Sequence, residues 1–237
     1  TRELEKKMRT NEKLASLGEF AAGLAHEIKN PLASVSGSIQ MLQGSDSTED
    51  QKFRLMSIIM RETDRLDRLL NDFLNYAKPG QLKLEELSIA EIASEVAALI
   101  KNQEQSKEIR FELQMNKDLK IEADPIKVRQ LIWNLLKNAV DAIHQRGEIV
   151  IRLSDLGEKV RLEIQDSGCG MEKEIQDHVF QPFFTRSQNG TGLGLALVHQ
   201  VVKEHQGEMG FVSEKDKGTQ FWIEFSKKVR SEEKVVA

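Results

Sequence analysis

Two apolar repeats occupy the first third of this chain of 237 residues and restrict what it can fold into. In the first repeat, one set of positions is spaced by seven, and a second set, weaker toward its end, lies between them: Leu14, Ala21, Ile28, Val35 and Leu42, with Leu17, Leu24, Pro31 and Ser38. The second repeat alternates steps of four and three: Leu55, Ile59, Glu62, Leu66, Leu69, Phe73 and Tyr76. This spacing predicts two α-helices with a coiled-coil-like seam, over about 14–42 and 51–77.

The two predicted helices form a hairpin whose apolar faces are too broad to be covered by one another. A polar turn at 44–50 separates the helices, and Lys78-Pro79-Gly80 ends the second one. The apolar stripe of the first helix is widened by Phe20, Ala25, Leu32 and Ile39. We therefore expect the hairpin to pair with its copy as an antiparallel four-helix bundle in a homodimer. The alternative is a monomer whose helices pack on the rest of the chain.

The hydrophobic period changes after Gly80, which indicates a second domain of a different class. The pattern predicts strands at about 82–87, 109–115, 148–154, 159–165, 208–213 and 219–226, and helices at about 89–103, 125–144 and 192–205. Asp124-Pro125 supplies the cap and the first turn of the middle helix. Helices mixed with antiparallel strand pairs indicate an α+β domain, in which helices cover one face of a single sheet.

We therefore expect a multidomain chain, an all-α helical hairpin followed by an α+β domain. The predicted parts are an N-terminal signalling helix at 1–13, the hairpin at 14–78, a hinge at 79–81, the α+β domain at 82–228 and a flexible tail at 229–237.

Charge and composition narrow the class of protein. A formal net charge of −4 gives no reason to expect nucleic acid as a partner. The one cysteine rules out an intramolecular disulfide and fits a reducing compartment. No apolar run approaches the roughly 20 residues that cross a bilayer, so we expect no membrane contact by this chain. Because the chain starts at Thr1 within a helical pattern, we expect it to be the cytoplasmic part of a longer protein, and whether that protein is membrane-anchored stays open.

The run from His26 to Leu32, His-Glu-Ile-Lys-Asn-Pro-Leu, offers a nucleophile. The heptad places His26 opposite the seam, where its imidazole can be reached. Glu27 is placed to hydrogen-bond the ring nitrogen that does not attack and to take its proton. Asn30 shares the face of His26, and Pro31 predicts a bend in the helix. A single histidine on a charged helix is usually just a surface residue, and it is these neighbours that favour a reactive one.

Asn134 and Asn138 are one helical turn apart, so their amide oxygens share a face of the predicted helix. Mg²⁺ takes oxygen ligands and keeps waters and phosphate oxygens around one or two protein groups, a role that an asparagine carbonyl suits. Lys137 lies between them and could reach phosphates, although an ordinary surface lysine is the default interpretation. A pair of asparagines at this spacing also occurs by chance.

Asp166 ends a predicted strand and is followed by Ser-Gly-Cys-Gly. A carboxylate at this point can accept a hydrogen bond from the exocyclic amine of adenine. Gly168 and Gly170 would let the backbone pass close to a flat base. The alternative is a tight Asp-Ser-Gly turn with no ligand.

A glycine-rich run lies just before a predicted helix, where free amides and the helix dipole attract phosphates. Its candidate residues are Gly190, Thr191, Gly192, Leu193, Gly194 and Leu195. The run has neither the strand-first order of a dinucleotide fold nor the Gly-Lys-Ser/Thr ending of a P-loop. Upstream, Phe180 to Phe184 and the polar residues 185–189 are typical of a hinged lid that excludes water, with Phe184 and Arg186 as candidate contacts. Thr219 is a further candidate, with a plain hairpin turn as the alternative.

In order and spacing, these motifs resemble those of the sensor histidine kinases of two-component systems. The runs 26–32, 134–138, 166–170, 180–184 and 190–194 are similar to the H-box, N-box, first glycine box, F-box and second glycine box of that family. The resemblance covers about residues 10–228, and the Asn-Pro-Leu run and the short lid resemble its nitrogen-regulation branch. It implies a dimerisation and histidine-phosphotransfer hairpin, followed by a Bergerat-type ATP-binding domain like those of gyrase and Hsp90.

The resemblance also implies an activity: ATP-dependent autophosphorylation of His26, followed by transfer of the phosphoryl group to an aspartate in the receiver domain of a response regulator. It assigns Asn138 as the stronger Mg²⁺ ligand, Asn134 as its assistant and Asp166 as the adenine-binding residue. Asn30 resembles the residue with which such proteins also dephosphorylate their partner. Two alternatives remain: a nucleotide-binding scaffold, disfavoured by the His26–Glu27 pair, and an ATPase or protein-serine kinase, which would have no use for a dimeric hairpin.

Overall fold

The computed structural model describes residues 2–44, 48–77, 82–103, 107–116, 119–185 and 190–228, and only the backbone of residues 2–22 and 75–77. The chain divides into two compact units, residues 1–77 with 182–193 and residues 78–181 with 194–237. No described helix is long and apolar enough to cross a membrane.

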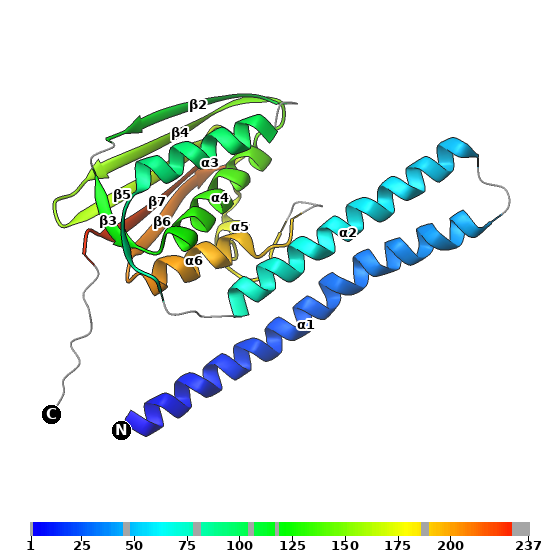
Figure 1. The fold of residues 1–237 in the computed structure, drawn as a ribbon, viewed down its shortest axis with the longest axis horizontal. Helices are drawn as coiled ribbons and strands as arrows, with labels where there is room; N and C mark the ends of the chain where they lie inside the picture. Colours follow the sequence, from blue (N-terminus) through cyan, green and yellow to red (C-terminus); the bar gives the residue numbers. More distant parts are fainter. Residues whose placement is uncertain are drawn as a thin grey trace. The chain divides into compact units, whose positions relative to one another are not determined.

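The first unit is built on a helical hairpin. Its helices are α1 (Arg2–Gln43) and α2 (Glu49–Ala77), which lie side by side in Figure 1. α1 continues through Pro31. α2 begins with a capping box: the Gln51 amide donates to Thr48 Oγ1 (3.3 Å), and the Thr48 amide donates to Gln51 Oε1 (3.0 Å). The predicted hairpin is confirmed, and the capping box explains why α2 starts two residues before the predicted boundary.

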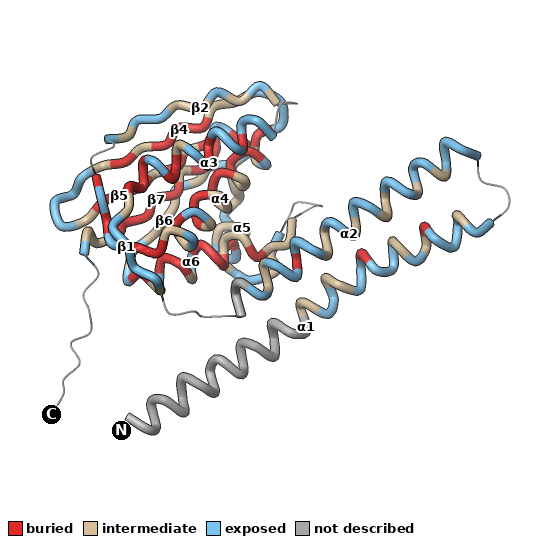
Figure 2. Tube along the Cα trace, in the orientation of Figure 1, coloured by how far each residue is buried: buried red, intermediate tan, exposed pale blue. Residues whose placement is uncertain are grey.

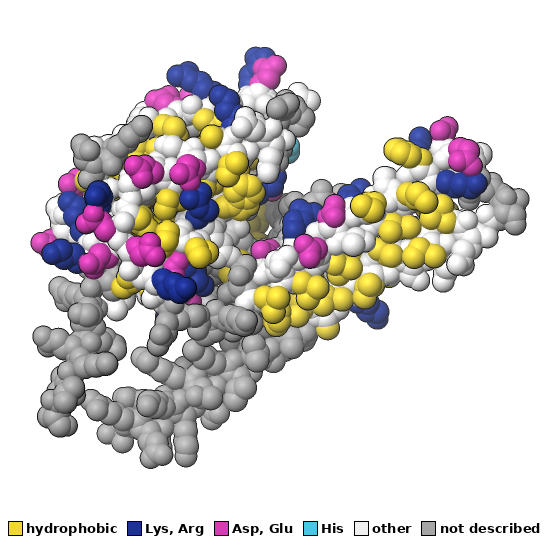
Figure 3. Space-filling model, viewed as in Figure 1, with side chains coloured by type: hydrophobic (Ala, Val, Ile, Leu, Met, Phe, Trp, Pro, Cys, Tyr) yellow, Lys and Arg dark blue, Asp and Glu magenta, His cyan; other side chains and the backbone are white. Residues whose placement is uncertain are grey.

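The predicted seam faces the interior of the hairpin. Among the described residues, Pro31, Ser38 and Leu69 of the seam are buried. A second apolar set stays exposed: Leu32, Ile39 and Met41 on α1, and Phe53, Met56, Met60, Leu70 and Leu74 on α2. Figure 2 shows exposed positions along both helices, and Figure 3 shows hydrophobic side chains at the surface of the hairpin. On α2 this exposed set falls on a repeat with steps of three and four, as a second seam would, except that the polar residues Thr63 and Asp67 occupy the two positions between Met60 and Leu70.

The second unit is an α+β domain. In chain order its described elements are β1 (Glu85–Ser88), α3 (Ile89–Gln103), β2 (Glu108–Met115), β3 (Lys120–Ala123), α4 (Pro125–Ala142), β4 (Arg146–Asp155), β5 (Lys159–Asp166), α5 (Lys173–Gln176), α6 (Gly194–Glu204), β6 (Glu208–Glu214) and β7 (Gly218–Ser226). Among the described residues, five strands form one sheet in the order β2-β4-β5-β7-β6, and β1 pairs with β3 separately. Figure 1 shows α3, α4 and α6 on one face of the larger sheet.

The predicted α+β class is confirmed, with four differences of detail. The expected single sheet is wrong: among the described residues the first predicted strand, observed as β1, pairs with β3 in a sheet of two strands apart from the larger one. β3 and the short helix α5 were not predicted, since four residues carry too little periodicity to stand out. β2 runs parallel to β4, where only antiparallel pairs were expected. The reason is that α4 lies between these strands in the chain, and a helical crossover returns the chain in the same direction.

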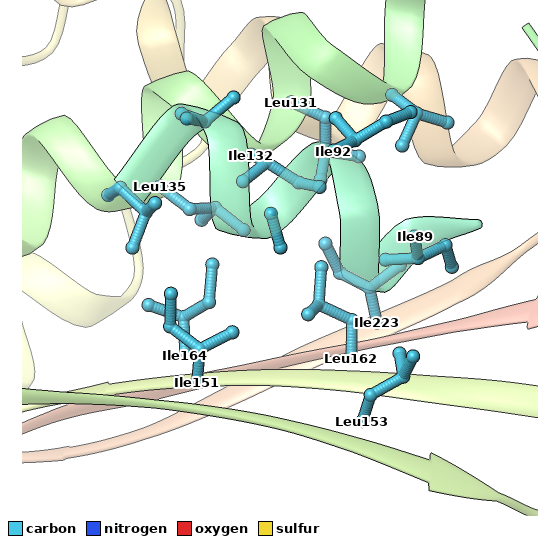
Figure 4. Packing of buried hydrophobic residues seen from close by; sticks show 14 of the residues in the cluster. Ile89, Ile92, Leu131, Ile132, Leu135, Ile151, Leu153, Leu162, Ile164 and Ile223 are labelled. Atoms are coloured by element: carbon cyan, nitrogen blue, oxygen red, sulfur yellow. The ribbon is translucent and has the colours of Figure 1, made fainter. Parts of the chain in front are cut away.

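The core of this unit lies between the sheet and the helices, as the close view in Figure 4 shows. The labelled side chains come from α3, α4 and the sheet strands, and all are buried: Ile89, Ile92, Leu131, Ile132, Leu135, Ile151, Leu153, Leu162, Ile164 and Ile223. Along β5 every second residue is buried, so the sheet packs one face on the helices. This core fixes α4 against the sheet.

Asp124 joins several elements at the start of α4. Its Oδ1 accepts from the amides of Ile126 (3.0 Å) and Lys127 (3.2 Å), which caps the helix. Its Oδ2 accepts from the amide of Lys83 (2.9 Å), and its own amide donates to Nε2 of the buried His205 (3.0 Å). Burial raises the pKa of the Asp124 carboxyl, but these amide donors outweigh it and hold the pKa below its ordinary value.

Candidate functional site

His26 is exposed on α1, as the heptad predicted. Asn30 lies one turn on, with its Nδ2 3.5 Å from His26 Nδ1. The other ring nitrogen, Nε2, has no hydrogen-bond partner in the described part of the chain. The arrangement therefore engages one nitrogen of the imidazole and leaves the other open to solvent.

Glu27 points to the second helix rather than to the histidine. Its Oε2 lies 3.1 Å from Arg65 Nη2 of α2, and each of these side chains is about one-fifth exposed, 20% and 21%. The predicted hydrogen bond from Glu27 to the His26 ring is absent from the described contacts. Adjacent helical residues point in directions about 100° apart, which explains why the carboxylate reaches Arg65 instead.

The two asparagines of α4 lie on its half-buried side. Asn134 Nδ2 is buried and has no hydrogen-bond partner among the described residues. A Cβ added to Gly194, the first residue of α6, would lie 3.6 Å from Asn134 Oδ1, so this amide faces the start of α6. A buried amide with an unmade hydrogen bond is costly unless a ligand completes it. Asn138, one turn on, is half-buried.

Lys137 lies between the two asparagines in sequence but pairs with an acid. Its Nζ is 3.3 Å from Asp141 Oδ1 on the same helix, and both side chains are well exposed. The structure thus brings Asn134 together with Gly194, while the predicted phosphate contact of Lys137 competes with an ion pair.

Asp166 ends β5 and is 6% exposed. Its Oδ1 accepts from the amide of Gly168 (2.8 Å), and the amide of Thr219 also donates to the carboxylate. Burial raises the pKa of Asp166, and the two amide donors oppose this shift only in part. Thr219 Oγ1 lies 2.8 Å from Ser213 Oγ, which also accepts from the amide of Met171 (2.9 Å). Asp166 and Thr219, both predicted site residues, therefore lie in one buried polar cluster.

Gly168 and Gly170 have a packing role that the sequence did not reveal. A Cβ at Gly168 would lie 2.6 Å from the carbonyl oxygen of Ala142, and one at Gly170 would clash with the carbonyl oxygen of Glu214. Gly170 also has φ +60°, which side chains rarely adopt. Both glycines hold the loop after β5 against its neighbours, and their predicted approach to a base stays a prediction.

The remaining candidates divide between the two units. Gly194 and Leu195 begin α6, whereas Gly190, Thr191, Gly192 and Leu193 group with the hairpin, as do Phe183 and Phe184. Thr191 Oγ1 donates to Asp72 Oδ2 of α2 (2.8 Å). Arg186 lies outside the described residues.

Several residues of these clusters were not predicted: Arg65, Asp72 and Ser213. Each makes a hydrogen bond with a residue more than 35 positions away in the chain: Arg65 with Glu27, Asp72 with Thr191, and Ser213 with Met171. No local motif marks such a residue. In the described part of the chain, no group of three or more His, Cys, Asp or Glu side chains could hold a metal ion.

Two family matches cover most of the chain. Residues 16–82 match the His Kinase A (phospho-acceptor) domain, and residues 123–229 match the histidine kinase-, DNA gyrase B-, and HSP90-like ATPase family. The first match contains His26, and the second contains both asparagines, Asp166 and the glycine-rich run.

Similar proteins and structures agree with these matches. The catalytic domain of the histidine kinase ThkA is 32% identical, with a TM-score of 0.57 over 62% of this chain and 97% of that domain. ThkA in its complex with the response regulator protein TrrA is 30% identical, with a TM-score of 0.81 over 95% of this chain and 66% of ThkA. The sensor histidine kinase ZraS of Escherichia coli (strain K12) is 36% identical over 93% of this chain and 48% of ZraS. The chain spans about half the length of this curated relative.

Proposed function

Since the chain belongs to the sensor histidine kinases of two-component systems, we propose that it uses ATP to phosphorylate itself on His26. The observation that carries this proposal is the exposed imidazole of His26, whose Nδ1 is contacted by Asn30 while Nε2 is open. In the reaction, a ring nitrogen attacks the γ-phosphorus, the bond from that phosphorus to the bridging oxygen breaks, and ADP leaves. Placement in the nitrogen-regulation branch stays a prediction.

The contact between Asn30 and His26 constrains which nitrogen reacts. Attack by Nε2 needs a free lone pair there, so the proton of the neutral ring must sit on Nδ1. The Asn30 atom that lies near Nδ1 is the donor Nδ2, so the side-chain amide must first turn and present its oxygen to Nδ1, since a protonated nitrogen cannot accept. In this role Asn30 is a positioning residue that selects the tautomer.

Glu27 is the proposed acceptor of the proton that the ring loses. Its ion pair with Arg65 occupies the carboxylate, so the transfer requires Glu27 to turn from Arg65 toward the imidazole. A half-buried pair resists such a change more than an exposed one does. This step would make the rate of phosphorylation sensitive to the packing of α1 on α2.

The α+β unit is the proposed ATP site. The unmade hydrogen bond of the buried Asn134 amide supports a polar ligand at the start of α6. The amides of Gly194 and Leu195 at this helix terminus suit phosphate. The carboxylate of Asp166, held by Gly168 and Thr219, suits the exocyclic amine of adenine.

Asn138 and Asn134 are the proposed ligands of Mg²⁺, for which amide oxygens on one face of α4 are suitable donors. The half-buried position of Asn138 fits a ligand at this place, while the unsatisfied Nδ2 of Asn134 is a donor and fits a phosphate oxygen rather than the cation. When bound, Mg²⁺ would offset the negative charge of the phosphate oxygens. Lys137 has three N–H donors, of which Asp141 need engage only one, so the remaining donors could add to this charge balance.

The proposed acceptor after His26 is an aspartate in the receiver domain of a response regulator, which the complex of the similar histidine kinase ThkA with the response regulator protein TrrA supports. The exposed His26 face of the hairpin would serve this transfer, and Asn30 would also serve dephosphorylation of the partner. We further propose that the hairpin forms a homodimer and that this part of the protein works in the cytoplasm, where ATP is supplied.

Incorporation of label from γ-labelled ATP tests the proposal. We expect an acid-labile label on the wild-type chain, and its loss in both His26→Gln and Asn138→Ala. An acid-stable label would support a protein-serine kinase instead. Binding of ATP without any label would leave a nucleotide-binding scaffold and would contradict the proposed function.

A further inference from the structure

Phe183 has a backbone conformation that bulky residues avoid. Its φ is +65°, a region in which an aromatic residue is a genuine outlier. Its amide donates to the carbonyl oxygen of Gly192 (3.0 Å), and a Cβ at Gly192 would clash with the backbone of Phe183. Phe183 and residues 190–193 therefore form one tightly packed element, called here the glycine-rich element. Strain of this kind persists only where surrounding contacts hold it.

The ring of Phe183 packs on the helix that carries His26. A Cβ added to Gly23 of α1 would lie 2.6 Å from Cδ2 and 2.9 Å from Cε2 of this ring. Gly23 precedes His26 by three residues, about 4.5 Å along the helix axis. Glycine weakens a helix interior, so here the absence of a side chain has a use: it leaves a notch that the aromatic ring fills.

A second contact ties the same element to the other helix of the hairpin. Thr191 Oγ1 donates to Asp72 Oδ2 (2.8 Å), and it accepts weakly from the amide of Leu193 (3.4 Å). Asp72 is half-buried on α2. Burial raises the pKa of its carboxyl, while the hydrogen bond from Thr191 and the charge of Arg68 act in the opposite direction. The glycine-rich element is thus held on both helices.

We propose that Gly23 and Asp72 form a docking site for the glycine-rich element, and that docking competes with the binding of a nucleoside triphosphate. The proposal rests on the proposed function in one respect, the assignment of Thr191 to the phosphate site. A hydroxyl has one proton, so Thr191 cannot donate to Asp72 and to a phosphate oxygen together. The carboxylate of Asp72 would also repel a phosphate.

The competition must act in both directions. A triphosphate that binds the undocked element more tightly shifts the equilibrium away from docking, and docking lowers the apparent affinity for the triphosphate by the same factor. The two arrangements would let the hairpin, which also carries His26, regulate the nucleotide site.

Two test variants, each with a matched control, test the docking site and its competition with nucleotide binding. Asp72→Ala removes the acceptor of the hydrogen bond from Thr191. Gly23→Ala fills the notch on α1 and also raises helix propensity, so a loss of docking in this variant cannot be ascribed to a weakened helix. Asp64→Ala is the control for an exposed acid of α2, and Gly37→Ala is the control for α1, since a Cβ at Gly37 meets nothing within 4 Å. With a fluorescent ATP analogue, we expect both test variants to bind about fivefold or more tightly than wild type, and both controls to bind as wild type does.

The hydrogen-exchange rates of the Phe183 and Leu193 amides, measured without nucleotide, report on docking independently of nucleotide binding. We expect faster exchange in Gly23→Ala than in Gly37→Ala. Equal exchange in these two variants would overturn the docking site, whatever the ATP result. Faster exchange with unchanged affinity would overturn the competition. If the two variants show this difference in exchange but the wild-type protein does not bind the analogue, the proposed function is contradicted and the docking site still stands.

Discussion

At the scale of a single residue, the environment of Asp166 acts on the pKa of its carboxyl in two opposite directions. Burial favours the protonated carboxyl and raises its pKa, whereas two amide donors favour the charged form. The carboxylate is held in one orientation by Gly168 and Thr219. A desolvated acceptor of fixed orientation discriminates strongly between ligands, because a ligand without the matching donor leaves it unpaired.

The raised pKa of Asp166 predicts how nucleotide binding depends on pH. Adenine needs the ionised acceptor, so affinity for an ATP analogue should fall as the pH drops through the raised pKa, above the ordinary value of about 3.9. Protonation relieves a buried charge and so favours the folded state, which means that binding is lost before the fold is. Titration of affinity from pH 7 to 4, with circular dichroism at each pH, measures the two separately.

Asp166→Asn is the control, since the titration of the nucleotide itself is common to both proteins. We expect this variant to bind about tenfold or more weakly at pH 7, the effect of losing one charge-assisted hydrogen bond. The difference between the two proteins should shrink as the pH falls. A constant difference down to pH 4 would contradict the assignment of Asp166 to adenine.

Glu27 illustrates what a sequence pattern can and cannot predict about a residue. The heptad correctly predicted that His26 is exposed, because period alone decides which face a helical residue occupies. The partner of Glu27 depends on which residue of α2 lies opposite, and that is set by the length of the turn and the register of the two helices. Arg65 is 38 residues away, and nothing in the local motif marks it.

At the scale of elements, the loop after β5 depends on glycines whose absent side chains make room for other backbone. Gly170 has φ +60°, and a Cβ there would clash with the carbonyl oxygen of Glu214 at the end of β6. Gly157, in the turn between β4 and β5, has a similar φ of +80° but nothing within 4 Å. Both positions have a backbone conformation that would strain a residue with a side chain, but only Gly170 is also in close contact with other backbone.

Substitution of each glycine by alanine should separate the free-energy cost of the positive φ from the cost of the steric clash. Gly157→Ala should lower the free energy of unfolding by about 1 kcal/mol, the cost of a left-handed residue with a side chain. Gly170→Ala should lower it by about 2 kcal/mol more, because the loop must also shift. Urea denaturation measures both values. Equal losses would mean that the loop adapts without cost, and that its packing on β6 does not position Asp166.

Long elements with a clear period were predicted well, and short or paired ones were not. The helix at 89–103 was predicted with its observed bounds, since seven buried apolar residues mark its inner face. β3 has four residues, and only Ile121 and Ala123 alternate inward, which is too little for a pattern. The parallel pairing of β2 with β4 depends on the path of the chain through α4, which local periodicity does not contain.

At the scale of the whole molecule, the hairpin has more apolar surface than one copy can cover. On α2 the inward seam and the exposed set, Phe53, Met56, Met60, Leu70 and Leu74, are separate stripes of the same helix. On α1 Leu32 and Ile39 are seven residues apart and also exposed. Contiguous exposed apolar surface of this kind marks an interaction site, and two matching stripes on one hairpin favour a second copy as the partner.

A homodimer should therefore dissociate when charge is placed on the exposed stripe of α2. Met56 and Met60 are 61% and 63% exposed, and their burial in a bundle should contribute about 1.5–3 kcal/mol each. Met56→Lys/Met60→Lys should raise the dissociation constant by roughly a hundredfold or more, as sedimentation equilibrium would show. Val212→Lys is the control, because Val212 is 70% exposed on β6 of the other unit, and it should leave the dimer intact. The thermal midpoint of the wild type should rise with protein concentration, as it does when association stabilises the fold. A monomeric wild type, or a double variant that still dimerises, would contradict the proposed bundle.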